Sequence, residues 1–363
     1  MTTNAKQKGL CVDAYGDRRA RKARRFIRDH GPGVRDPESK PGGTYLVTGC
    51  AGFIGSHLVE ALRARGCGVI GVDGFIDTYS RTTKELNLLQ CAGRDLPFVE
   101  LDLAEAPVEP LLDGVDGVFH LAGRPGVRTS WGSSFGAYTR DNLLATQRVF
   151  EAAVKRNVRV VYASSSSVYG NADSYPVRED DRLAPMSPYG VTKLASESLA
   201  IAYAESQGLD AVGLRYFSVF GPRQRPDMAF ARVFKCMREN GRFPLLGYGF
   251  QSREFTYVGD VVEATLLAMQ RAPSGRVYNV GGGREIPMLD ALLMCERIAG
   301  EELQVDNIPE VAGDPHRTSA DIGRAEAELG WTPSTPFEDG LRAQAFCALE
   351  LAGDRAEVEA AAS

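Results

Sequence analysis

The sequence is poor in histidine and lacks any paired-cysteine motif. Only four histidines occur among 363 residues, and none of them clusters with cysteines or carboxylates, so we expect no metal site. The seven cysteines are scattered without a Cys-x-x-Cys pair. Because their number is odd and their spacing irregular, we interpret them as reduced thiols and not as a disulfide framework.

Long apolar runs are also absent. No stretch reaches the roughly 18 apolar residues that would indicate a bilayer span, and the N-terminus has no apolar signal-peptide core. The formal net charge of −5 provides no field that would recruit nucleic acid or an acidic membrane as the main partner. We therefore expect a cytoplasmic protein with neither of these partners.

Residues 1–41 differ in composition from the rest of the chain. Basic residues crowd between Arg18 and Arg28, and glycines and prolines follow them. Because charge runs usually stay hydrated, we interpret residues 1–41 as a flexible basic arm. Contact of this arm with RNA or with a partner protein is the alternative.

From Thr44 onward, short apolar runs alternate with amphipathic stretches. This alternation is typical of βαβ units in a parallel sheet, so the expected fold class is α/β. After Tyr216 the pattern weakens, and we expect the later segments to build a smaller α/β region that covers the substrate. The expected elements are strands at 44–47, 69–72, 98–101, 118–121 and 159–162, and helices at 54–65 and 142–154.

A glycine-rich turn follows the first expected strand. Gly49, Gly52 and Gly55 lie where this strand passes into a helix. In a dinucleotide site the first glycine permits the tight turn, the second lets the pyrophosphate approach, and the third lets helix and strand pack closely. The turn therefore predicts a Rossmann-type doubly wound sheet, with phosphates at the helix N-terminus beside Phe53 and Ile54.

Asp73 ends the second expected strand, about 20 residues beyond the turn, where a dinucleotide site needs a carboxylate. It is placed to accept hydrogen bonds from the adenosine ribose hydroxyls, and its charge would repel the 2′-phosphate of NADP. NAD is therefore the expected cofactor. The segment after the third strand is expected beside adenine, which adds Asp102 and Leu103 to the cofactor residues.

Tyr189 and Lys193 form a Tyr-x-x-x-Lys pair. One helical turn puts both side chains on the same face. A tyrosine with an unperturbed pKa near 10 is a poor base at neutral pH, but a neighbouring ammonium and a positive nicotinamide lower that pKa. The pair therefore predicts proton transfer at a substrate hydroxyl.

These motifs together resemble the extended short-chain dehydrogenases, specifically the nucleotide-sugar epimerase and dehydratase family. The resemblance runs from about Thr44 to Leu341. It also rests on segments that lie between and beyond the two motifs. These are His120–Leu121–Ala122–Gly123, Asn142, Ser164 to Gly170, Leu214 to Pro222, and Arg253 to Val258.

The resemblance implies roles for individual residues. Ser165 matches the family's catalytic Ser/Thr, which hydrogen-bonds the sugar 4-hydroxyl and helps to pass its proton to Tyr189. Lys193 completes the catalytic set. Arg253 matches the arginine that binds the nucleotide diphosphate, for which a bidentate guanidinium is well suited. The further cofactor contacts that the resemblance implies are Leu121, Ala122, Asn142, Tyr189 and Lys193.

The two positions after Ser165 bear on the reaction. In this family Tyr189 would take the 4-hydroxyl proton while carbon 4 gives hydride to NAD, leaving a 4-keto sugar. The family's dehydratases place Asp-Glu after the catalytic residue and its uronate decarboxylases place Ser-Glu, whereas this chain has Ser166 and Ser167. The resemblance therefore implies an isomerase: the keto sugar rotates and the hydride returns to its other face, which is 4-epimerisation.

The segment Gly221 to Met228 resembles the Gly-Pro-x-x-Arg-Pro-Asp-Met segment of UDP-glucuronate 4-epimerases. UDP-glucuronate is thus the implied substrate and UDP-galacturonate the implied product. Serine hydroxyls could hold the carboxylate by charge-assisted hydrogen bonds, and a carboxylate held still is protected from loss as carbon dioxide. His316 or Arg317 could add a nucleotide contact. The implied substrate contacts are Arg128, Ser165, Ser166, Ser167, Ser218, Arg225, Arg232 and Arg253.

Several alternatives stay open at this point. A 4-epimerase of neutral sugars, acting on UDP-glucose or UDP-N-acetylglucosamine, is the nearest, followed by a decarboxylase or a dehydratase. An NAD-sensing binding protein represents a different class. Relatives often pair through two long helices, which implies a homodimer. The expected organisation is an arm at 1–41, an NAD-binding domain at 42–216 and 255–285, a nucleotide-sugar-binding region at 217–254 and 286–350, and a tail at 351–363.

Overall fold

The computed structural model describes residues 42–349 apart from residues 94, 310–312 and 314. The predicted basic arm and the predicted tail lie outside the described residues. No helix in the described ranges is long and apolar enough to cross a membrane.

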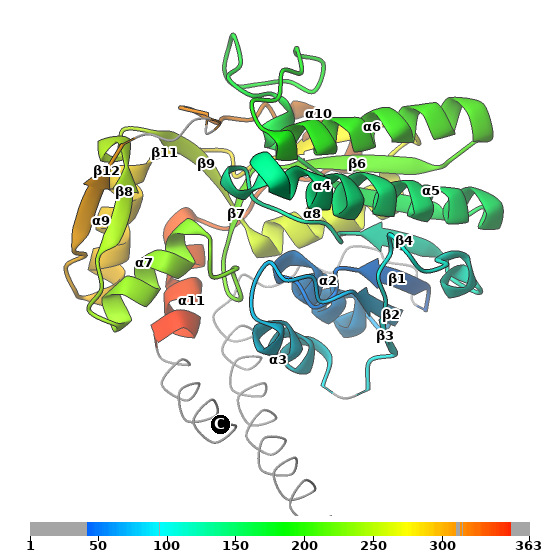
Figure 1. The fold of residues 1–363 in the computed structure, drawn as a ribbon, viewed down its shortest axis with the longest axis horizontal. Helices are drawn as coiled ribbons and strands as arrows, with labels where there is room; N and C mark the ends of the chain where they lie inside the picture. The colour runs from blue at the N-terminus through cyan, green and yellow to red at the C-terminus, as the bar shows by residue number, and fades with distance from the viewer. Residues whose placement is uncertain (1–41, 94, 310–312, 314, 350–363) are drawn as a thin grey trace, which may run out of the picture.

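A seven-stranded sheet forms the centre of the molecule, and all of its strand pairs are parallel (Figure 1). The expected strands are all present, within one to three residues of their predicted ends. In spatial order the strands are β10 (Val277–Val280), β6 (Ala211–Tyr216), β5 (Arg159–Ser165), β4 (Gly117–His120), β1 (Thr44–Thr48), β2 (Gly68–Asp73) and β3 (Phe98–Glu100).

Helices cover both faces of this sheet, which confirms the predicted doubly wound Rossmann-type fold (Figure 1). One face carries α2 (Phe53–Ala64), α3 (Arg81–Ala92) and α8 (Val258–Arg271), with α10 (Gly323–Leu329) packed against α8. The other face carries α5 (Ala145–Arg156) and α6 (Pro188–Gln207).

The helix predicted at 142–154 belongs to a longer helical run. It begins with α4 (Phe135–Tyr138), continues as a π-helical segment, η4 (Thr139–Leu144), and ends with α5. A π-helical turn inside a helix is uncommon and is found often at functional sites. Asn142 lies within it.

The later segments build two small sheets and three helices beside the large sheet (Figure 1). The helices are α7 (Ala229–Arg238), α9 (Met288–Ala299) and α11 (Phe337–Leu349), which pack against one another. The small sheets contain β11 (Glu285–Pro287), β9 (Ser252–Tyr257) and β7 (Ser218–Phe220), and β12 (Val305–Ile308) with β8 (Phe243–Leu246). Because β9 continues past residue 254, the predicted domain border falls inside a strand, and that division remains a prediction.

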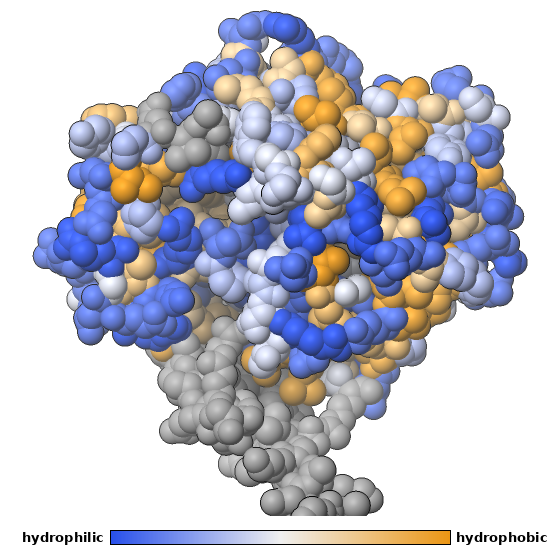
Figure 2. Space-filling model, viewed as in Figure 1, coloured by the Kyte–Doolittle hydropathy of each residue, from blue (hydrophilic) through white to orange (hydrophobic). Residues whose placement is uncertain are grey.

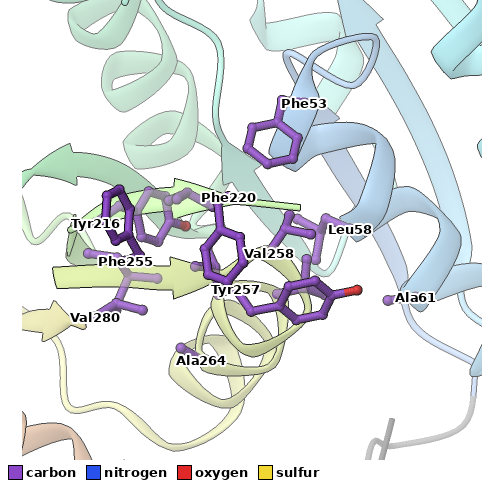
Figure 3. Close-up of a cluster of buried hydrophobic side chains, with 14 of the residues drawn as sticks. Phe53, Leu58, Ala61, Tyr216, Phe220, Phe255, Tyr257, Val258, Ala264 and Val280 are labelled. Carbon is purple, nitrogen blue, oxygen red and sulfur yellow. The ribbon is translucent and has the colours of Figure 1, made fainter. Parts of the chain in front are cut away.

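A buried aromatic cluster joins the small sheets to the large one (Figure 3). The rings of Phe220 on β7 and Phe255 on β9 lie 6.3 Å apart, and the ring of Phe337 stacks on Phe255 at 5.4 Å. Tyr257 and Val258 continue the cluster toward Leu58 of α2 (Figure 3). Burial of apolar area contributes about 25 cal/mol per Å², so this cluster fixes the small region against the cofactor-binding helix.

The register of the central strands brings their carboxyl ends to one edge. Thr48 at the end of β1 pairs with Val72 on one side and with His120 on the other. The strand order reverses between β1 and β4, and ligands of doubly wound sheets bind outside such a reversal.

Candidate active site

The glycine turn after β1 has the conformation that its sequence predicts. Gly49 has a φ of +71°, and a Cβ there would lie 2.8 Å from the Ala122 nitrogen. A Cβ on Gly55 would lie 2.1 Å from the Gly49 oxygen. Gly52 caps α2, whose first N–H groups have no acceptor within the helix. Side chains at Gly49 and Gly55 would therefore collide with backbone, and N–H groups at the start of a helix suit a pyrophosphate.

Asp73 lies at the end of β2, directly beside the turn. Its Oδ1 accepts a hydrogen bond from the Phe75 backbone N–H at 2.8 Å and its Oδ2 accepts one from Ala51 at 3.2 Å. Burial raises the pKa of Asp73, while the Lys84 ammonium acts in the opposite direction. The carboxylate is thus fixed in orientation and keeps lone pairs for ribose hydroxyls.

A cavity of about 330 Å³ opens at the carboxyl ends of the strands and gathers most of the predicted cofactor and catalytic residues. Its walls come from the ends of β1 to β5, from α6 and from the segment after β7. The predicted residues that line it are Gly49, Gly52, Phe53, Ile54, Gly55, Asp73, Asp102, Leu103, Leu121, Ala122, Ser165, Ser166, Ser167, Tyr189, Lys193, Ser218 and Arg225.

Asn142 is not among the residues that line this cavity. It is 1% exposed, and its side chain connects two elements behind the wall. Its Oδ1 accepts from the Arg124 backbone at 2.6 Å, and its Nδ2 donates to Thr192 Oγ1 at 3.0 Å. The structure therefore gives Asn142 the geometry of a positioning residue between α6 and the segment after β4.

Tyr189 and Lys193 lie at the start of α6. Ser187 caps this helix by accepting a hydrogen bond from Gly190 at 3.1 Å, and Pro188 occupies the first helical position. Both features favour helix initiation at this point. The local sequence therefore places Tyr189 in the first turn, where its side chain faces the end of β5.

Ser165, the last residue of β5, lies against Tyr189. Burial raises the pKa of Tyr189, whereas a hydrogen bond with Ser165 and the charge of Arg225 lower it. The Ser165 hydroxyl also donates to Ser167 Oγ at 3.1 Å. A hydroxyl bonded to the phenol at the mouth of a cavity is suited to relay a proton from a bound alcohol.

The ammonium of Lys193 points across the end of β5. It donates a hydrogen bond to the Ala163 carbonyl at 2.9 Å. Burial lowers the pKa of Lys193 to about 8, and the Glu197 carboxylate opposes this change. Glu197 itself pairs with Arg215 at 2.7 Å, with both side chains 4% exposed.

A second cavity, of about 560 Å³, continues from the first into the small region. The two share Ser218, Val219 and Met228, so one ligand could extend through both. The predicted residues that line the second cavity are Arg128, Ser218, Arg232, Arg253 and His316.

Arg317 lies outside this cavity's lining. Its Nε pairs with Glu285 at 2.7 Å, and its guanidinium stacks on the ring of Tyr175 at 4.8 Å. Of the two candidates for an additional nucleotide contact, His316 is therefore the one that faces the cavity.

Two basic side chains at the first cavity were missed by sequence reasoning. Lys84 of α3 is 4% exposed and donates to the Ile76 carbonyl at 2.5 Å. No motif marks it. Arg124 directly follows the His120 to Gly123 segment. Its position next to this motif could have identified it as a cavity residue.

The first cavity contains carboxylates, but they come from the ends of β2 and β3 and from the η4 segment. They are Asp73, Asp102 and Asp141. Ser166 and Ser167, which follow Ser165, carry only hydroxyls. Across the residues that the structure describes, no group of three or more His, Cys, Asp or Glu side chains could hold a metal ion.

Comparison with known proteins gives a consistent picture. Residues 45–281 match the model of the "NAD dependent epimerase/dehydratase family". A UDP-glucuronate 4-epimerase of Thermodesulfobacterium geofontis (strain OPF15) is 34% identical over 309 residues, 83% of this chain and 94% of that protein. A Bacillus subtilis (strain 168) protein named "Uncharacterized UDP-glucose epimerase YtcB" is 41% identical over 300 residues, 82% of this chain and 95% of that one.

A solved structure is equally similar. The crystal structure of UDP-glucuronic acid 4-epimerase from Bacillus cereus, in complex with UDP-glucuronic acid and NAD, superposes with a TM-score of 0.82 at 40% identity. The similarity covers 85% of this chain and 99% of that one.

Proposed function

The chain belongs to the NAD dependent epimerase/dehydratase family, as its sequence motifs predict, and we propose that it converts UDP-glucuronate to UDP-galacturonate by epimerisation at carbon 4. The observation that carries this proposal is the composition of one cavity. Ser165, Tyr189 and Lys193 share it with the glycine turn, while Ser166 and Ser167 provide no acid for elimination.

The cofactor is NAD. When bound, it can accept a hydride from carbon 4 of the sugar and return it. We assign its pyrophosphate to the start of α2 at Gly52, Phe53 and Ile54. Asp73 would accept the adenosine ribose hydroxyls, and its negative charge disfavours a 2′-phosphate. The close packing at Gly49 and Gly55 supports this assignment, because a side chain at either position would collide with backbone and displace the turn that leads into α2.

The proton steps belong to Ser165 and Tyr189. Ser165 would accept a hydrogen bond from the sugar 4-hydroxyl and help to pass the hydroxyl proton to Tyr189. Tyr189 would take this proton and later return it. Lys193 contributes a positive charge that favours phenolate. The phenol has to alternate between two protonation states, so the charges and the hydrogen bond that lower its pKa, against the burial that raises it, favour this role.

The absence of a carboxylate at positions 166 and 167 bears on the fate of the oxidised sugar. Elimination of the 6-hydroxyl or assisted loss of carbon dioxide needs an acid or base near carbons 5 and 6. Here the 4-keto sugar meets hydroxyl groups. Rotation of the sugar and return of the hydride to its other face is the course that these residues favour.

The uronate carboxylate is assigned to the serines and to Arg225. Arg225 lines the first cavity together with Ser166, Ser167 and Ser218. Its guanidinium is 19% exposed and pairs with Asp227 at 2.8 Å. A partly buried guanidinium makes strong bidentate contacts with carboxylates. Fixing the carboxylate keeps its carbon–carbon bond away from the orientation in which a β-keto acid loses carbon dioxide.

The diphosphate of the substrate is assigned to the arginines of the second cavity. Arg128, Arg232 and Arg253 line it from three different elements. The Arg253 Nη1 donates to the Ser252 and His316 carbonyls at 2.8 and 3.1 Å, which orients its guanidinium. His316 would approach the same nucleotide.

One incubation tests this function. The purified protein is mixed with UDP-glucuronate, UDP-glucose or UDP-N-acetylglucosamine without added NAD, and products are identified by NMR. Conversion of UDP-glucuronate to UDP-galacturonate is the expected result, and it also reports retained NAD. Formation of a UDP-pentose or of a 4-keto-6-deoxy sugar would contradict the proposal.

A neutral-sugar 4-epimerase is the second candidate. The named UDP-glucose epimerase is the observation that favours it. In the same incubation this candidate predicts turnover of UDP-glucose to UDP-galactose and no change in UDP-glucuronate.

We further propose a homodimer formed through α5 and α6. Leu144, which immediately precedes α5, is 41% exposed, and Val191 and Ile201 on α6 are 46% and 58% exposed. Apolar surface lies over these helices in the space-filling view (Figure 2). Light scattering after gel filtration measures the mass, and Ile201→Arg should halve it. The cytoplasmic location and the absence of a nucleic-acid partner remain predictions.

A further inference from the structure

Two walls of the first cavity are joined by an ion pair. The segment 74–79, which follows β2, contributes Gly74, Ile76, Thr78 and Tyr79 to one wall, and residues 121–125, which follow β4, form the other. Asp77 belongs to the first segment and Arg124 to the second. The Arg124 Nη2 lies 2.9 Å from the Asp77 Oδ1, so the contact spans the opening between the ends of β2 and β4.

The two ends of this ion pair are held very differently. The Arg124 side chain is 19% exposed, and its Nε pairs with Asp141 at 2.7 Å, a carboxylate only 5% exposed. The Asp77 side chain is 89% exposed. Breaking the pair therefore releases the loop end into solvent, while Arg124 stays anchored to Asp141.

The base of the Asp77 loop is braced against the cofactor site. The Phe75 N–H donates to Asp73 at 2.8 Å, and the Lys84 ammonium donates to the Ile76 carbonyl at 2.5 Å. Phe75 has a φ of 47°, which is uncommon for a residue with a side chain. With the base fixed in this way, the Arg124 contact joins the exposed tip of the loop to the opposite wall.

Further ion pairs connect Asp141 to the segment that follows β3. The Asp141 Oδ1 accepts from Arg140 at 2.8 Å, and Arg140 in turn pairs with Asp102, the residue predicted beside adenine. A line of alternating charges thus runs from the loop after β2 to the segment after β3. Three of its members, Arg124, Asp141 and Asp102, line the first cavity, in which the adenosine half of NAD is expected beside Asp102.

We propose that the Arg124–Asp77 ion pair is a tie that slows the release of NAD. The dinucleotide would leave after the pair has opened and the loop has moved aside. An epimerase uses one NAD in both directions of a single turnover, so slow release keeps the keto sugar and its reductant together. The proposal rests on the NAD site of the family and not on the identity of the sugar.

The size of the effect follows from the exposure of Asp77. Exposed ion pairs contribute little, and loss of this one should speed NAD release about two- to fivefold. Salt screens such a pair. Rising ionic strength should therefore speed release from the unmodified protein and have much less effect once Asp77 carries no charge.

The test measures cofactor release directly. The protein is loaded with NADH, excess NAD is added, and the fall in NADH fluorescence gives the release rate at low and high salt. The key variant is Asp77→Asn. Asp77→Glu preserves the ion pair, and Asp306→Asn is a matched control, since it removes an exposed carboxylate paired with Arg242 at 2.6 Å in the small region.

Faster, salt-insensitive release from Asp77→Asn, with unmodified rates in Asp77→Glu and Asp306→Asn, is the expected result. Release from Asp77→Asn at the unmodified rate would overturn the proposal, as would equal acceleration by Asp306→Asn. No sugar nucleotide enters this assay. Its failure is therefore distinguishable from failure of the proposed epimerase function, which the NMR incubation measures.

Discussion

The guanidinium of Arg225 lies close enough to Tyr189 to lower the pKa of its phenol, against the burial that raises it. The sequence suggests Arg225 only as a contact for the substrate carboxylate. Its position gives it an additional electrostatic effect on the proposed base. Substrate binding and proton transfer are therefore coupled at this residue, because a carboxylate bound to Arg225 would weaken that effect.

Tyr189→Phe should abolish most of the activity. The change removes one hydroxyl and leaves the ring in its contact with Tyr138, whose centroid lies 6.3 Å away. Loss of a positioned acid–base group typically costs about 10²–10⁴-fold in rate. Product formation by NMR should fall by this amount, while bound NAD, measured by absorbance of the denatured supernatant, is retained.

Tyr203→Phe is the matched control for that substitution. Tyr203 lies on the same helix, and its hydroxyl accepts from Gln147 at 2.9 Å, away from the cavity. It should keep the activity of the unmodified protein. Equal losses in the two variants would mean that the effect reflects α6 and not the proposed base.

The parts of the fold that were predictable are those set by local constraints. Buried parallel strands read as short apolar runs, and β1, β2, β4 and β5 were found in this way. The glycine turn was predictable because two of its glycines, Gly49 and Gly55, meet backbone at distances that a side chain could not tolerate, such as 2.1 Å at Gly55.

The parts that sequence reasoning missed depend on contacts between distant segments. Arg124 and Asp77 are 47 positions apart, and neither residue type indicates the other as its partner.

Arg215 is more instructive, since an arginine inside the apolar strand β6 indicates a buried partner. That partner is Glu197. It can be identified only from the way α6 packs on β6, and the spacing of residues along the chain does not reveal this packing.

Glu197→Gln should shift the pH dependence of the reaction. Glu197 raises the pKa of Lys193, whereas burial lowers it to about 8. Lys193 is charged below that pKa and loses its charge as the pH rises through it, so activity should fall there. Removing the Glu197 charge lowers the pKa further. The alkaline limb of kcat should therefore move to lower pH, as measured across the neutral and alkaline range.

Stability has to be measured alongside, since the substitution leaves Arg215 without its carboxylate. Breaking a buried ion pair can cost about 3–5 kcal/mol, and a lowered melting temperature is expected. Glu205→Gln, at an exposed position of the same helix, should change neither property. An alkaline limb that stays in place in a folded Glu197→Gln protein would contradict the role of Glu197 in holding the Lys193 charge.

Arg225→Gln should weaken uronate binding more than neutral-sugar binding. A hydrogen bond to a charged group contributes about 1.5–3 kcal/mol, so KM for UDP-glucuronate should rise roughly 10- to 100-fold. The pKa of Tyr189 in the free enzyme should also rise, because a charge that lowers it is gone, and the acidic limb of kcat/KM should move to higher pH. Arg156→Gln, which removes a surface guanidinium paired with Asp113 and lining neither cavity, serves as the control. An unchanged KM would exclude Arg225 as a carboxylate contact.

Ser167→Glu should redirect the keto intermediate. A 4-keto uronate is a β-keto acid, and a new carboxylate at position 167 would repel the substrate carboxylate from the hydroxyls that hold it. The ratio of UDP-pentose to epimer should then rise about tenfold, which corresponds to about 1.4 kcal/mol between the two courses. NMR of the products measures both species in one sample. Ser167→Gln, which has similar size and no charge, should lower total turnover without this change in ratio. If both variants gave the same pentose fraction, steric displacement of the sugar would explain the result, and the charge at position 167 would not determine the outcome of the reaction.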